Sequence, residues 1–232
     1  NIYEIAQKIT NKYRNDGYIL SKAIVPPQKI NDGVVHLRII EGYIDKIKIQ
    51  GPVRGPRKLI NKYKKNILKS RPLRAHDLER YLLLIDDLPG VTAKSILTPS
   101  EDNPSATTMT LILADKAFVG HIGADNRGSK FNGPYQFLGG VTVNSLLGDH
   151  SRAGLQGVFT SQTDELLFLN AFYDLPINQE GTRLFFSSSV SKSEPGSTLK
   201  QFDINGDSSS ITLRLTHPFL RSRAKNLTGH LG

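Results

Sequence analysis

The spacing of hydrophobic and polar positions changes near residue 117 of this chain. Before that point, apolar residues recur at three- and four-residue intervals in several segments, which is typical of amphipathic helices. After it, apolar and polar residues alternate, which is typical of strands with one apolar face. We therefore predict an α+β region followed by an all-β region.

The α+β region contains two units of related order. In residues 1–42, a helix over 2–13 precedes strands over 18–25 and 34–40, with a turn at Asn31-Asp32-Gly33 between them. The second unit is expected to have a strand, two helices and two strands, over residues 44–50, 59–68, 78–88, 91–97 and 107–113. If the first unit has the same order, its opening strand and first helix are missing. We therefore expect a fragment that begins inside a domain.

The all-β region is expected to contain six strands and the start of a seventh. They cover residues 118–125, 135–144, 153–159, 167–175, 183–191 and 210–219, and the seventh begins near Asn226. Strands of this length, with shorter turns on one side and mostly longer loops on the other, are typical of an outer-membrane barrel. A soluble β-sandwich also alternates. We favour the barrel because Gly and Ser lie on one face and Phe on the other.

Charge follows the same division. Of a net charge of +9, residues 1–117 carry 20 basic against 12 acidic side chains, and residues 118–232 carry 10 against 9. No apolar run approaches the roughly 20 residues of a membrane-spanning helix, so a helical membrane protein is excluded, whereas a β-barrel is not. The absence of cysteine excludes disulfides and thiolate metal sites.

Signals of catalysis are weak. The His residues are scattered, and Asp149-His150-Ser151 is contiguous, so on a strand its neighbours point to opposite faces. Ser189 and Lys192 match S-x-x-K, but on an alternating strand and not at a helix start. We expect no enzyme, no cofactor and no metal site.

A basic run extends from Arg54 to Arg74, with nine Lys or Arg and no acidic residue. Its candidate contact residues are Arg54, Arg57, Lys58, Lys62, Lys65 and Lys69. A solvated helix face and a contact with an acidic partner or anionic headgroups both stay open. Nucleic acid is the least favoured partner because few aromatic residues interleave with the charges.

An ordered series of motifs carries a family resemblance: GADNRGSKFNGPY (123–135), NSLLGD (144–149), YDLP (173–176) and HPFLRS (217–222). The series resembles the opening of the barrel in two-partner secretion transporters, the haemolysin-activator and filamentous-haemagglutinin transporter family. The unit at 43–115, with Leu88-Pro89-Gly90-Val91 after its second helix, resembles a polypeptide-transport-associated (POTRA) domain.

The resemblance implies α+β POTRA domains followed by the first antiparallel strands of a transmembrane β-barrel of about 16 strands. Residues 1–42 would be the C-terminal part of a first POTRA domain and 43–116 a second one. Residues 117–232 would supply six barrel strands and the start of the seventh.

The function implied is two-partner secretion across the outer membrane. Periplasmic POTRA domains would capture an unfolded exoprotein through its N-terminal secretion domain, and the barrel would pass it to the cell surface. The complete barrel would be a monomer in contact with outer-membrane lipid, without nucleic acid or cofactor. The alternatives are an insertase of the barrel-assembly type, or a soluble POTRA-like binding module with a β-sandwich.

The expected capture site is an exposed sheet edge over residues 91–97, where a substrate strand would pair with the main chain. Its candidate residues are Val91, Thr92, Lys94 and Ile96. Proline at Lys94 or Ile96 is expected to abolish capture, because proline lacks the N–H that a strand donates.

Overall fold

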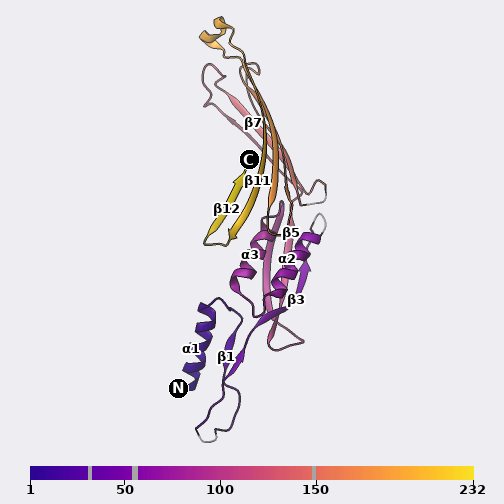
Figure 1. The fold of residues 1–232 in the computed structure, drawn as a ribbon. Coiled ribbons are helices and arrows are strands. Elements are labelled where there is room, and N and C mark those ends of the chain that lie inside the picture. Colours follow the sequence, from indigo (N-terminus) through magenta and orange to yellow (C-terminus); the bar gives the residue numbers. More distant parts are fainter. Residues whose placement is uncertain (31–32, 54–56, 148–149) are drawn as a thin grey trace.

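A computed structural model describes residues 1–30, 33–53, 57–147 and 150–232. Helix α1 and a small strand pair lie at one end of an elongated molecule, a sheet covered by two helices lies in the middle, and a long antiparallel sheet forms the other end (Figure 1). The expected turn at Asn31-Asp32, the turn at Gly148-Asp149 and the candidate residue Arg54 lie outside the described residues.

The N-terminal part consists of α1 (Ile2–Asn15), β1 (Lys22–Ile24) and β2 (Arg38–Ile40), with the two strands antiparallel. Thr10 joins helix and strand, because its hydroxyl accepts a hydrogen bond from the Ala23 N–H at 3.0 Å. The strands are shorter than their alternation predicts. Between them, the Gln28 side chain bonds both the N–H and the C=O of His36, which replaces strand pairing there.

The middle part runs β3 (Tyr43–Gln50), α2 (Lys58–Lys69), α3 (Ala75–Asp86), β4 (Val91–Pro99) and β5 (Ala106–Asp115). This is the strand-helix-helix-strand-strand order expected from the sequence. In the sheet, β5 lies in the centre, parallel to β3 and antiparallel to β4. Both β3 and β4 are therefore edge strands.

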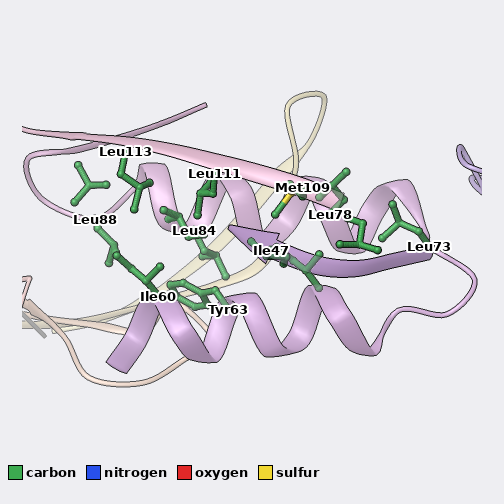
Figure 2. Packing of buried hydrophobic residues seen from close by; sticks show 14 residues of the cluster. Ile47, Ile60, Tyr63, Leu73, Leu78, Leu84, Leu88, Met109, Leu111 and Leu113 are labelled. Atoms are coloured by element: carbon green, nitrogen blue, oxygen red, sulfur yellow. The ribbon is translucent and has the colours of Figure 1, made fainter. Parts of the chain in front are cut away.

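The hydrophobic core lies between the helices and one face of this sheet (Figure 2). Its fully buried members include Ile44, Ile60, Tyr63, Ile67, Leu73, Ile85, Met109 and Leu111. On β5 the buried Met109, Leu111 and Leu113 alternate with half-buried residues, as expected for a strand with one face against helices.

The C-terminal part is a single antiparallel sheet in which each strand pairs with the next along the chain. Its strands are β6 (Phe118–Asp125), β7 (Gln136–Asn144), β8 (Arg152–Thr160), β9 (Leu167–Pro176), β10 (Arg183–Ser193), β11 (Gly206–Arg221) and β12 (Asn226–Leu231). The hairpin of β10 and β11 is longer than predicted, and its loop contains a short helix, η1 (Ser197–Phe202). The Ser-rich stretch hid this extension, because serine gives little hydrophobic contrast.

None of the helices in the described ranges has the length and apolar character needed to cross a membrane.

The long sheet has two chemically different faces. One face exposes large apolar side chains, among them Ile122 at 93% and Ile211 at 75% exposure. The opposite face carries polar groups, including Asp174, whose carboxylate accepts hydrogen bonds from Arg152 and Arg183 at 2.9 and 3.0 Å. Within the described chain no second sheet covers the apolar face, as a sandwich would require.

Leu111→Ala should lower the free energy of unfolding of the middle part by about 2–5 kcal/mol, because it leaves a cavity among α2, α3 and the sheet. Native-state hydrogen exchange of α2 and α3 amides measures this. Thr92→Ala, at an exposed position of β4, is the control and should change the value by less than about 0.5 kcal/mol. Equal effects of the two substitutions would contradict this packing.

Candidate functional site

A groove of about 640 Å³ lies between α3 and the β4 edge. Its α3 wall is mostly apolar and its β4 wall is formed by residues 93–95. The lining consists of Ile19, Ala75, Leu78, Glu79, Leu82, Leu83, Asp86, Ala93, Lys94, Ser95 and Arg223. The groove therefore combines apolar surface with the free edge of a sheet.

Hydrogen bonds at both ends of β4 determine which of its main-chain groups point into the groove. The Lys116 N–H donates to the Gly90 C=O at 2.8 Å, and the Ser100 N–H donates to the Ala106 C=O at 3.1 Å. In an antiparallel pair, hydrogen-bonded and non-bonded residue pairs alternate. Even-numbered β4 residues therefore bond to β5, and odd-numbered residues direct their N–H and C=O groups away from it.

The contacts of Ala93 agree with this alternation. Its N–H points away from β5 and donates to the Asp86 carboxylate on α3 at 2.9 Å. The next two outward N–H groups, on Ser95 and Leu97, have no hydrogen-bond partner in the part of the chain that is described. Unpaired groups of this kind form the template that an edge strand offers to an added strand.

The four candidate residues of this edge differ in burial. Val91 is buried at the start of β4, where it packs in the core. Thr92, Lys94 and Ile96 are exposed and share the sheet face that lies away from α3. The groove is also lined by residues that sequence reasoning missed: Leu78 and Leu82 on the α3 wall, and Ala93 and Ser95 on the β4 wall. The small side chains of Ala93 and Ser95, alternating with larger ones, are the signal that could have indicated this groove.

The predicted basic face is present on α2. Lys58, Lys62, Lys65 and Lys69 follow one another at four-, three- and four-residue intervals and are exposed. They lie opposite the buried Ile60, Tyr63 and Ile67 and make no ion pair with any described residue. Arg57, also exposed, directly precedes the helix. Because α2 packs on β3 and α3 on β4, this face is separate from the groove.

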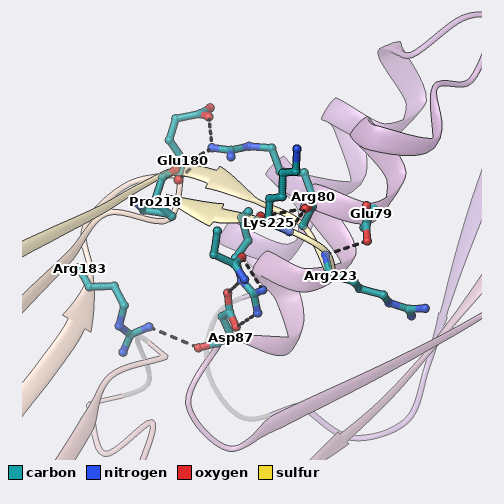
Figure 3. A network of polar contacts seen from close by, with 11 residues as sticks. Glu79, Arg80, Asp87, Glu180, Arg183, Pro218, Arg223 and Lys225 are labelled. Carbon is teal, nitrogen blue, oxygen red and sulfur yellow. Dashed lines mark hydrogen bonds and ion pairs between the residues drawn. The ribbon is translucent and has the colours of Figure 1, made fainter. Parts of the chain in front are cut away.

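Polar contacts fix α3 to the long sheet (Figure 3). Asp87, at the C-terminus of α3, accepts two hydrogen bonds from the Arg221 guanidinium, each at 2.7 Å. Arg80, whose side chain is 12% exposed, donates to the carbonyl oxygens of Glu180 and Pro218 at 3.4 Å. Two turns of the long sheet, β9–β10 and β11–β12, are thereby held against one helix.

Close packing supports these contacts. Gly181 has a φ of +87°, and a Cβ there would lie 2.6 Å from Leu84 Cδ2 on α3. A cavity of about 300 Å³ continues from this junction to the polar face of the sheet, where Arg152 and Arg183 line it. Tyr63 lines its α2 side, and burial raises the pKa of the Tyr63 phenol, so the group stays neutral.

The structure describes the candidate catalytic residues only in part. Asp149 of the Asp-His-Ser sequence lies outside the described residues, and His150 and Ser151 are buried. Over residues 1–30, 33–53, 57–147 and 150–232, no three His, Asp or Glu side chains are grouped so as to hold a metal ion.

Comparison with known families assigns the chain to one of them. The family described as haemolysin secretion/activation protein ShlB/FhaC/HecB matches residues 113–232, more than half of the chain. The chain belongs to this family. The ShlB-type POTRA domain matches residues 1–42. The resemblance seen in the motifs is confirmed, as is the fold class of POTRA-type α/β structure followed by barrel strands. The family also confirms the prediction that the chain is not an enzyme.

Curated relatives are longer than this chain. It is 27% identical to the heme/hemopexin transporter protein HuxB of Haemophilus influenzae (strain 86-028NP) over 223 residues, which cover 96% of the chain and 39% of HuxB. It is 30% identical to the outer membrane transporter CdiB of Dickeya dadantii over 150 residues, covering 63% and 26%. The chain thus spans 39% of the length of the HuxB relative.

Solved structures share the fold. CdiB from Escherichia coli superimposes with a TM-score of 0.68 at 23% identity, covering 95% of this chain and 41% of CdiB. BamA from Haemophilus ducreyi lacking POTRA domains 1–3 gives a TM-score of 0.51 at 14% identity, covering 94% and 41%. Both matches cover nearly the whole chain, so the shared fold includes its α+β part and its long sheet.

Asp87→Ala should loosen the junction, because Arg221 loses the bidentate carboxylate that holds the β11–β12 turn on α3. Since the chain has no cysteine, spin labels can be placed at cysteines replacing Glu101 and Lys225. We expect a broader distance distribution than in the parent protein. Asp102→Ala, in an exposed loop, is the control and should leave the distribution unchanged. An unchanged width for Asp87→Ala would contradict the role of this contact.

Proposed function

We propose that this chain is part of an outer-membrane transporter of a two-partner secretion system. Its POTRA domains lie in the periplasm and capture an unfolded exoprotein through an N-terminal secretion domain, and the barrel passes that protein to the cell surface. Membership of the haemolysin secretion/activation family supports this, as do relatives named heme/hemopexin transporter and outer membrane transporter. The observation that carries the proposal is the unpaired β4 edge beside an apolar groove.

Capture would occur by addition of a substrate strand to β4. The main chain at Ser95 and Leu97 would bond to the added strand, because these residues direct their N–H and C=O groups away from β5. Substrate side chains on one face would enter the groove against α3. Those on the other face would lie beside Thr92, Lys94 and Ile96, which supply side-chain contacts only.

This mode of binding suits a substrate that must be released again. Each main-chain hydrogen bond contributes only about 1 kcal/mol net, and the short edge offers few of them. Main-chain pairing also demands little of the substrate sequence. The apolar wall of α3, including Leu78 and Leu82, adds contact area and favours segments with alternating apolar residues.

Two further contacts belong to this proposal. The exposed apolar face of the long sheet would contact outer-membrane lipid, and the complete barrel would be a monomer. The basic face of α2, with Arg57, Lys58, Lys62, Lys65 and Lys69, would contact an acidic partner, either the exoprotein or anionic headgroups.

The structure shows that Lys94 and Ile96 are the wrong positions for a proline substitution that tests capture. The N–H groups of Lys94 and Ile96 point to β5, so proline there would damage the sheet itself. Ser95→Pro removes an outward N–H and leaves the pairing with β5 in place. We expect it to weaken binding of the exoprotein secretion domain to the full-length transporter by about tenfold, the equivalent of about 1.4 kcal/mol.

Ser95→Ala is the matched control, because it keeps the main-chain N–H and should bind like the parent protein. Binding is measured by titration of the labelled secretion domain onto the transporter in nanodiscs, with hydrogen exchange as a check that β4 still pairs with β5. If a folded Ser95→Pro variant binds as tightly as Ser95→Ala, capture does not use this edge.

A further inference from the structure

We infer that the β11–β12 turn of the barrel forms one end of the β4 groove, and that Arg223 on this turn selects an acidic residue in the captured segment. The inference rests on the proposed function and extends it. In this arrangement, residues of both the POTRA-type domain and the barrel line the capture site.

The position of Arg223 is fixed by main-chain contacts. Its N–H donates to the Glu79 carboxylate on α3 at 2.9 Å, two residues after Arg221 bonds to Asp87. The turn is closed by the Ser222 N–H, which donates to the Lys225 C=O at 3.1 Å. Arg223 thus lines the groove together with α3 and β4, and Figure 3 shows its side chain extending away from Asp87.

The groove lining has two acidic residues, Glu79 and Asp86, and two basic residues, Lys94 and Arg223, so a preference for an acidic substrate residue would be local to Arg223. Its two acidic residues already accept main-chain N–H groups, Glu79 from Arg223 and Asp86 from Ala93. The exposed Arg223 guanidinium has no acidic partner among the residues described. A guanidinium can donate two parallel hydrogen bonds to one carboxylate. This end of the groove would therefore prefer an Asp or Glu side chain of the substrate.

One further lining residue indicates that the captured segment would contact more than one domain. Ile19, from the part of the chain before β1, also lines the groove. An extended segment on β4 would therefore contact the first POTRA-type unit, the second unit and the barrel turn at once. One of its acidic residues would be held directly below the barrel strands β11 and β12.

Photo-crosslinking tests the location. The full-length transporter in nanodiscs carries p-benzoylphenylalanine at position 95, 223 or 225, and the probe is the unfolded N-terminal secretion domain of its exoprotein. We expect crosslinks from positions 95 and 223 and none from 225, which lies on the same turn but outside the groove. A crosslink from 95 without one from 223 overturns this inference and leaves β4 capture standing. No crosslink from 95 overturns the proposed function.

Charge substitution tests the selectivity. Arg223→Gln should weaken secretion-domain binding about two- to fivefold at low salt and reduce its salt dependence, since an exposed ion pair is lost. Arg223→Lys should restore part of the salt dependence, and Lys225→Gln should change neither quantity. The crosslink from position 95 must persist in Arg223→Gln, which separates a lost contact from a displaced turn. Parent-like affinity and salt dependence in Arg223→Gln would overturn the selectivity.

Discussion

A β-sheet must pair its main-chain N–H and C=O groups or leave them to water or to a partner, and the two larger sheets of the described chain meet that requirement differently. In the barrel sheet, strands β7 to β11 are each paired on both sides along the order of the chain. In the POTRA-type sheet, β4 is paired only with β5, and its outward N–H groups at Ser95 and Leu97 have no hydrogen-bond partner among the described residues; Ser95 lines the groove. The first arrangement suits a wall in lipid, where unpaired groups are costly, and the second suits a capture site in an aqueous compartment.

The junction between these sheets fixes the position of the proposed capture site relative to the barrel sheet. Arg221 and Arg80 tie the two barrel turns to α3, and the same helix forms the apolar wall of the groove. In the proposed mode of binding, a captured segment would contact the same helix that contacts the barrel turns. Contacts of this kind join residues more than 100 positions apart in the sequence, such as Asp87 and Arg221.

The sequence predicted the order of the elements well, because hydrophobic spacing depends directly on whether the chain is helical or extended. It failed where residue types give little contrast, as in the Ser-rich start of β11, and where side chains replace strand pairing, as at Gln28. For the site, it placed the edge over residues 91–97 but named Val91, which is buried. Alternation shows which side chains share a face, but not which main-chain N–H groups point outward. The bonds at Gly90 and Ser100 were needed for that.

The proposed capture depends on the outward direction of the Ser95 and Leu97 N–H groups of β4. Residue-resolved hydrogen exchange of the full-length transporter, with and without the unfolded secretion domain of its exoprotein, measures it directly. We predict that the Ser95 and Leu97 amides exchange rapidly in the free protein and slowly in the complex, while those of Lys94 and Ile96 are protected in both. Unchanged exchange at Ser95 and Leu97 in a saturated complex, or new protection confined to β3, would contradict it.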